Sequence, residues 1–137
     1  MILIHSMFPL DYLSHIQLEH EIIDIEISSQ GNIVVQSKHL KSQYIIQVYN
    51  SNGRYLGSQS FNHSFKIKLS KKDPLFVLTS RTNEIHVYRE YSLELVRVLQ
   101  TSKAVVDACF ANEDNDLLCT CIGGHIVYIK DYMAISE

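Results

Sequence analysis

The sequence predicts an all-β fold that repeats a unit of short antiparallel strands, and three observations support this prediction. Apolar and polar residues alternate in several short segments, the pattern of a strand with one buried face. Turn-forming sequences separate these segments, among them Ser51-Asn52-Gly53 and Gly123-Gly124. Segments of the same kind also recur about every 42 residues, as Ile33, Leu75 and Leu117 show when they are placed in register.

The individual strands follow from the local pattern. Alternation is clear in residues 23–27, 65–69 and 84–88, and it predicts that the apolar residues of these segments face the core. Three other runs are continuously apolar, which is typical of strands buried on both faces: residues 33–35, 75–78 and 117–119. Residues 91–100 fit a helix and a strand about equally well on pattern, and the repeat favours the strand.

Each repeat contains four such strands in 40 to 45 residues, which is the unit of a β-propeller blade. One blade cannot bury both of its faces alone, so blades stack around an axis. We therefore expect a single partial β-propeller domain over residues 1–137, with about three and a half four-stranded antiparallel blades. The expected blade units are residues 1–19, 20–62, 63–101 and 102–137, and a last fourth strand is expected to begin at residues 132–135.

Composition and charge narrow the class of protein. The chain has 137 residues, and 12 basic against 15 acidic residues give a formal net charge of −3. This balance argues against a nucleic-acid-binding module, which normally has a basic face. The first residues lack the features of a signal peptide, and no run approaches the roughly 20 apolar residues of a membrane helix. Three cysteines without a secretory signal indicate reduced thiols and a cytoplasmic setting.

Catalytic and metal-binding motifs are not evident, so we expect no enzyme, no cofactor and no metal. Cys119, Cys121 and His125 could be considered as zinc ligands, but their spacing is not a standard zinc pattern. The nucleophile motif Gly-x-Ser-x-Gly is absent from the sequence. The lysines of residues 66–72 could contact an acidic partner or lipid head groups, and we favour a solvated strand edge instead.

In two of the repeats a histidine, His20 or His63, precedes the first predicted strand, and an aromatic-polar pair, Tyr49-Asn50 or Tyr88-Arg89, ends the third. This arrangement resembles the WD-repeat family, in which a His precedes the first strand of a blade and a Trp-Asp pair ends the third strand. Here Tyr-Asn and Tyr-Arg replace the Trp-Asp pair. The resemblance implies that each His helps hold one blade to the next by hydrogen bonding.

Three further stretches carry a second resemblance: Ile4-His5-Ser6-Met7-Phe8-Pro9-Leu10-Asp11-Tyr12-Leu13, residues 27–33 and residues 49–56. With these stretches the chain resembles the C-terminal propeller of BEACH-domain proteins, the neurobeachin and beige group. A chain of this length would correspond to part of such a protein. The resemblance implies a non-catalytic WD-repeat scaffold in vesicle and membrane trafficking, cytoplasmic and at most peripheral to vesicle membranes.

We expect the loops that join fourth to first strands and second to third strands to bind protein partners. The residues predicted there are Glu19, His20, Lys38, His39, Lys41, Asn62, His63, Arg81 and Asn83. Self-association that completes a propeller is a further expectation, because open blade faces leave apolar strands exposed to water. The alternative is a β-sandwich or barrel with a ligand- or metal-binding site, including a hydrolytic one.

Overall fold

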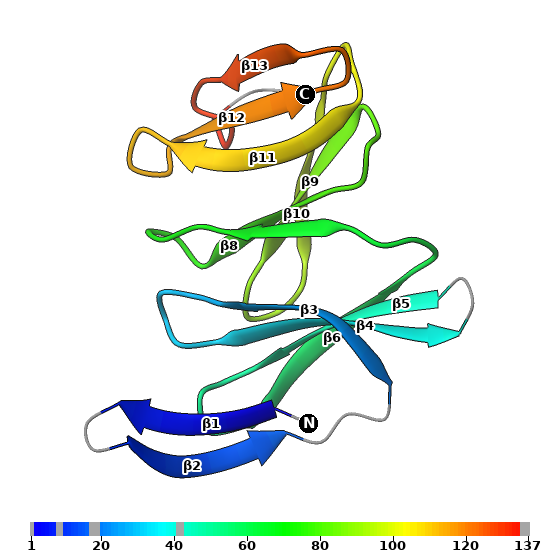
Figure 1. The fold of residues 1–137 in the computed structure, drawn as a ribbon. Helices are drawn as coiled ribbons and strands as arrows, with labels where there is room; N and C mark the ends of the chain where they lie inside the picture. Colours follow the sequence, from blue (N-terminus) through cyan, green and yellow to red (C-terminus); the bar gives the residue numbers. More distant parts are fainter. Residues whose placement is uncertain (1, 8–9, 17–19, 41–42, 135–137) are drawn as a thin grey trace. The chain divides into compact units, whose positions relative to one another are not determined.

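The computed structural model describes residues 2–7, 10–16, 20–40 and 43–134. Every regular element in this part of the chain is a β-strand, so the prediction of an all-β fold is confirmed (Figure 1). The described residues include no helix long and apolar enough to cross a bilayer.

The strands of the described residues form four separate sheets. In chain order the sheets contain two, four, four and three strands, and consecutive strands pair antiparallel within each sheet. The sheets span residues 2–16, 21–61, 66–100 and 105–129. Their contacts divide the chain into two compact units, Met1–His63 and Ser64–Glu137, here called unit 1 and unit 2.

Unit 1 holds the first two sheets. The two-stranded sheet consists of β1 (Ile2–Met7) and β2 (Leu10–Ile16). The four-stranded sheet consists of β3 (Glu21–Ile27), β4 (Ile33–Leu40), β5 (Gln43–Tyr49) and β6 (Tyr55–Phe61). A small core of Ile33, Val35 and Tyr49 forms on one face of this sheet, and Ile2 and Ile22 pack against it. The apolar run at residues 33–35 is buried throughout, as predicted.

The predicted burial of the isoleucines in β3 is wrong. Ile23, Ile25 and Ile27 are 41%, 42% and 69% exposed. The pairing register places Ile25 opposite Val35 and Ile27 opposite Ile33, so both share a face with the small core. However, Ile22 is the isoleucine of β3 that packs against the small core, and Ile25 and Ile27 stay exposed on the same face.

Unit 2 holds the other two sheets. Its four-stranded sheet consists of β7 (Lys66–Leu69), β8 (Leu75–Thr79), β9 (Glu84–Arg89) and β10 (Leu95–Gln100). Its three-stranded sheet consists of β11 (Val105–Ala111), β12 (Asp116–Cys121) and β13 (His125–Ile129). The strand β10 confirms the choice of a strand over a helix in residues 91–100. The expected fourth strand at residues 132–135 is wrong for Tyr132 to Ala134, which form a turn; Ile135 is outside the described residues.

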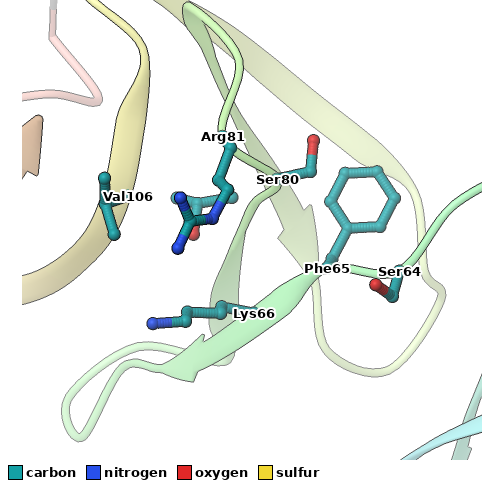
Figure 2. Close-up of a pocket in the computed structure, with 7 residues that line it drawn as sticks. Ser64, Phe65, Lys66, Ser80, Arg81 and Val106 are labelled. Carbon is teal, nitrogen blue, oxygen red and sulfur yellow. The ribbon is translucent and has the colours of Figure 1, made fainter. Parts of the chain in front are cut away.

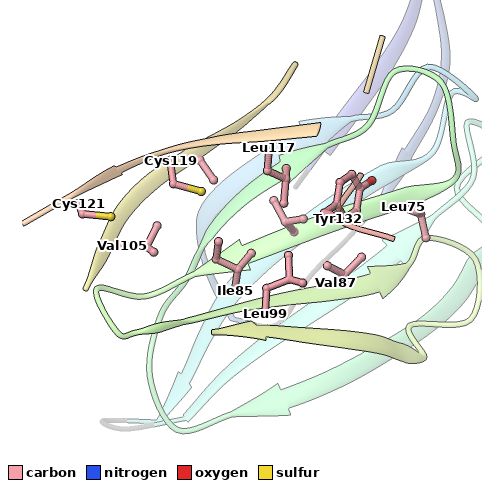
Figure 3. Packing of buried hydrophobic residues seen from close by; sticks show 11 residues of the cluster. Leu75, Ile85, Val87, Leu99, Val105, Leu117, Cys119, Cys121 and Tyr132 are labelled. Atoms are coloured by element: carbon pink, nitrogen blue, oxygen red, sulfur yellow. The ribbon is translucent and has the colours of Figure 1, made fainter. Parts of the chain in front are cut away.

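The core of unit 2 forms where its two sheets pack together (Figure 3). From the four-stranded sheet come Leu75, Val77, Ile85, Val87 and Leu99, and from the three-stranded sheet Val105, Ala108, Leu117, Cys119 and Cys121, with Tyr132 from the last turn. Each fully buried aliphatic side chain of this kind stabilises a fold by about 1.5–3 kcal/mol. This core therefore joins the two sheets into one unit.

The other face of the three-stranded sheet is apolar and exposed. The register places Cys109, Leu118 and Tyr128 side by side, and Ile126 next to Thr120, on the face opposite the core. Ile126 is 70% exposed and Tyr128 is 53% exposed. Leu118 is only partly buried, so the prediction that residues 117–119 are buried on both faces holds for Leu117 and Cys119 alone.

Candidate functional site

A cavity of about 220 Å³ lies in unit 2 where β7 begins and β8 ends. We call it the cationic cavity. Its lining combines residues before and in β7, residues at and after the end of β8, and one residue of β11: Ser64, Phe65, Lys66, Thr79, Ser80, Arg81 and Val106. Lys66 pairs with Thr79 in the register, which explains why the first residues of β7 and the last of β8 meet here. Figure 2 shows the Lys66 and Arg81 side chains extending towards the same space, with Val106 across from them.

Two cations set the electrostatics of this cavity. Lys66 Nζ lies 3.8 Å from Asp107 Oδ2, an exposed pair that contributes little stability. Arg81 is exposed and forms no ion pair with any described residue. Its backbone has φ of 60°, a left-handed conformation that costs a non-glycine residue about 1 kcal/mol or more. Arg81 thus contributes to the lining a guanidinium that forms no ion pair with the described residues.

The chemistry of the lining suits an anionic group. A guanidinium can donate two parallel hydrogen bonds to a carboxylate or a phosphate, and an ammonium adds a point charge. The hydroxyl groups of Ser64, Thr79 and Ser80 are further hydrogen-bonding groups along the same wall. The lining contains no histidine, cysteine or carboxylate, so it offers binding groups rather than an acid–base pair.

Sequence reasoning selected Arg81 but missed the rest of the cavity. Lys66 was read as one of several lysines on a solvated edge, and it is exposed, yet it also lines the cavity. The alternation of residues 65–69 placed Lys66 correctly on the face opposite Phe65 and Ile67. The hydroxyl residues gave no local signal, because only the pairing of β7 with β8 brings Ser64 near Ser80.

Two of the predicted partner-binding histidines are brought together in unit 1. The rings of His20 and His39 meet edge to face with centroids 3.8 Å apart, and ring nitrogens of the two lie 3.0 Å apart. The prediction that Lys38 and His39 lie in a loop is wrong, because both lie within β4, whose pairing with β5 extends to Leu40. Lys38 pairs with Glu21 of β3, next to His20.

Most of the remaining predicted residues lie in connections between strands. Asn62 and His63 lie between β6 and β7, and Asn83 lies with Arg81 in the loop between β8 and β9. Asn83 has a structural task there: its carbonyl oxygen accepts hydrogen bonds from the Thr101 amide at 2.8 Å and the Thr101 hydroxyl at 3.1 Å. Glu19 and Lys41 are outside the described residues.

Two of the three cysteines serve packing in this structure, whereas Cys109 is exposed. Cys119 and Cys121 lie on the same face of β12, as predicted, and both belong to the core of unit 2. Burial, and to a lesser degree neighbouring groups led by Cys121, raises the pKa of the Cys119 thiol to about 11. His125 pairs directly with Cys121 but is exposed. Among the described residues no three His, Cys, Asp or Glu side chains are grouped so that they could hold a metal ion.

A buried carboxylate organises the turns at one end of the three-stranded sheet. Asp116 is 2% exposed, and its Oδ1 accepts a hydrogen bond of 2.8 Å from the Asp131 amide. Its Oδ2 accepts hydrogen bonds from the Tyr128 hydroxyl and, at 3.2 Å, from the Asn112 side chain. These bonds, the Asp131 amide first, hold the pKa of Asp116 below its usual value.

Comparison with known proteins relates the chain to others by fold alone. No protein-family model matches the chain, and no curated protein sequence matches it. Among matching solved structures is a crystal structure of the uncharacterized protein lmo1340 from Listeria monocytogenes EGD-e, with a TM-score of 0.64 and 14% sequence identity. The match covers 91% of this chain and 41% of the Listeria chain, so this chain spans less than half the length of that protein.

Proposed function

We propose that this chain is a non-catalytic protein-interaction scaffold made of propeller-type blades. The observation that carries the proposal is the repetition of one sheet plan: β3 to β6 and β7 to β10 have the same sequential strand order, and β11 to β13 repeat its first three strands. Sheets of this kind stack on one another in propellers and present their connecting loops at the two ends of the stack. Such loops are where binding residues concentrate.

The proposal extends to the biological setting that the sequence resemblance suggests. We place the chain in a BEACH-type protein of vesicle and membrane trafficking, in the cytoplasm and at most peripheral to vesicle membranes. The similarities quoted above support this setting, as do the His residues before β3 and β7. In this setting the chain binds proteins rather than nucleic acid or lipid.

The cationic cavity supplies the chemistry of partner recognition. Arg81 carries an uncompensated charge at the end of unit 2 where the β6–β7 and β8–β9 connections lie. A guanidinium in this position favours a partner segment with an exposed aspartate or glutamate. Exposed apolar side chains on β3 and on the outer face of β11 to β13 support self-association as a second kind of contact.

Cross-linking in intact cells tests partner binding through the cavity. The full chain carries an affinity tag, and captured proteins are compared between the wild type, Arg81→Ala and Arg54→Ala. Arg54 is a matched control, because it is also an exposed arginine in a turn but does not line the cavity. We expect a set of proteins that the wild type and Arg54→Ala capture and that Arg81→Ala loses by about fivefold or more. Equal capture by all three chains would contradict the proposal.

A further inference from the structure

A second pocket of unit 2 carries the opposite charge. Three turns form this cavity of about 190 Å³: those between β7 and β8, between β11 and β12, and after β13. It is lined by Asp73, Asp114, Asn115, Asp131, Tyr132, Met133 and Ala134, and we call it the acidic pocket. It lies at the end of β7 where Leu69 pairs with Phe76, whereas the cationic cavity lies at the end where Lys66 pairs with Thr79. The two sites are therefore at opposite ends of the same sheet.

One of the three carboxylates is already used by the fold. Asp114 Oδ2 accepts hydrogen bonds from the Ser70 hydroxyl at 3.0 Å and from the amides of Lys71 and Lys72 at 2.5 and 2.9 Å. These bonds fasten the β7–β8 turn to the β11–β12 turn. Asp114 thus has a structural role and adds negative charge to the wall of the pocket.

The other two carboxylates are uncompensated. Among the described residues, the carboxylate oxygens of Asp73 and Asp131 accept no hydrogen bond and form no ion pair. Lys71 and Lys72, next to Asp73 in sequence, form no ion pair with the three aspartates in the described part of the chain. No basic side chain lines the pocket. Uncompensated charge of one sign in a concave site attracts a ligand of the other sign.

An independent observation comes from a buried phenol in the same wall. Tyr132 is 1% exposed, and its hydroxyl has no hydrogen-bond partner among the described residues. In Figure 3 its ring lies at one end of the core of unit 2, away from Cys119 and Cys121. Tyr132 lines the pocket together with Asp73 and Asp114. Burial, with smaller contributions from these two carboxylates, raises the pKa of the phenol to about 12. Leaving a buried hydroxyl unpaired is costly, which makes Tyr132 a group that a ligand would satisfy.

The number and direction of these groups favour an organic cation over a metal ion. No three carboxylates of the described residues converge as metal ligands would. A planar guanidinium, by contrast, has five N–H donors that spread over several acceptors. It can donate to more than one acceptor of the lining without requiring the acceptors to meet at one point.

We propose that the acidic pocket binds an arginine side chain of a protein partner. This inference deepens the proposed scaffold function, on which it rests, by naming the chemistry of a second recognition site. The partner segment would carry its arginine on an exposed strand or loop that reaches the turns of unit 2. The two ends of unit 2 would then select partner segments of opposite charge.

Nuclear magnetic resonance titration of the ¹⁵N-labelled full chain tests this binding. The probe is N-acetyl-arginine amide, and N-acetyl-citrulline amide is the uncharged probe of the same shape. We expect saturable shifts of the Asn115, Tyr132 and Met133 amides with arginine and none with citrulline. Asp131→Asn and Asp73→Asn should weaken the affinity about threefold each, and Tyr132→Phe about fivefold.

The controls separate this site from general charge effects and from the scaffold proposal. Glu113→Gln removes an exposed carboxylate next to Asp114 that does not line the pocket, and it should leave the affinity unchanged. Equal shifts with arginine and citrulline, no effect of Tyr132→Phe, or tighter binding of calcium that excludes arginine would each overturn the inference. Such a result would leave the partner test on Arg81 unaffected, since that site lies at the other end of the sheet.

Discussion

Strands β3 and β9 share one sequence pattern but have different surroundings. Both alternate apolar and polar residues, as Ile25-Glu26-Ile27 and Ile85-His86-Val87 show. In β9 the side chains of Ile85 and Val87 are fully buried against the three-stranded sheet, whereas Ile27 in β3 is 69% exposed. The difference follows from what covers each strand, because Ile85 and Val87 belong to the core between two sheets, whereas Ile27 is not part of the small core of unit 1. Alternation therefore identifies the apolar face of a strand but not whether another sheet covers it.

The largest effect that we expect is a difference in stability between two variants, each of which shortens one isoleucine in one of these strands. Ile85→Ala removes a side chain from the core of unit 2 and leaves a cavity, so we expect the free energy of unfolding to fall by about 2–5 kcal/mol. Ile27→Ala is the matched substitution on an exposed position, and we expect a change within about 0.5 kcal/mol. Urea unfolding monitored by circular dichroism measures both values. Similar losses for the two variants would mean that a further surface covers β3 in solution.

Association between copies of the chain is the second property that depends on the exposed strands. If the exposed strands pack on one another, sedimentation velocity of the purified chain should show a species heavier than 15.8 kDa whose share increases with concentration. A charged substitution on each exposed face, Ile25→Asp on β3 and Ile126→Asp on β13, should favour the monomer. We expect the dissociation constant of the assembly to rise about tenfold.

Tyr91→Asp provides the control for association. Tyr91 is 49% exposed and lies in a turn outside these two faces, so its substitution should leave the sedimentation unchanged. A compact monomer at all concentrations in the wild type would rule out this mode of self-association.

The smallest expected effect is on the pH dependence of unit 2. Hydrogen bonds lower the pKa of Asp116 in the folded chain, so its contribution to stability is present above the unfolded value of about 4 and is lost as the pH falls through the folded pKa. Asp116→Asn should therefore be less stable than the wild type near neutral pH, and the difference should shrink below about pH 4. Thermal unfolding from pH 2.5 to 7 measures this convergence, with Glu113→Gln as the control. A constant difference at every pH would contradict it.

Much of the fold was predictable because its strands carry local signals. The run at residues 75–78 was correctly assigned, because all four of its residues are buried. The alternation at residues 84–88 was correctly assigned as well, because Ile85 and Val87 are buried. The errors occur where the outcome depends on distant residues. Lys38 and His39 were assigned to a loop, because no local signal shows that the pairing of β4 with β5 continues to Leu40.

The candidate sites were harder to predict than the fold. Arg81 was selected from its place in a polar loop, but its partners in the cavity come from β7 and β11. The acidic pocket was not predicted at all, since Asp73, Asp114 and Asp131 are far apart in sequence and meet only when three turns gather at one end of unit 2. Tyr132 was expected to begin a strand, and its burial in a turn depends on the sheet that packs beneath it.

The strand β13 is an edge strand, and this position bears on how other chains can pair with the molecule. It pairs with β12 on one side, and along its other side no described strand accepts or donates main-chain hydrogen bonds. The exposed side chains of Ile126 and Tyr128 stand beside this row of unpaired amides and carbonyls. An extended segment from another polypeptide could add there as one more strand without disturbing the existing pairs. Amide hydrogens of β13 that become slow to exchange when a peptide is supplied would show such an addition directly.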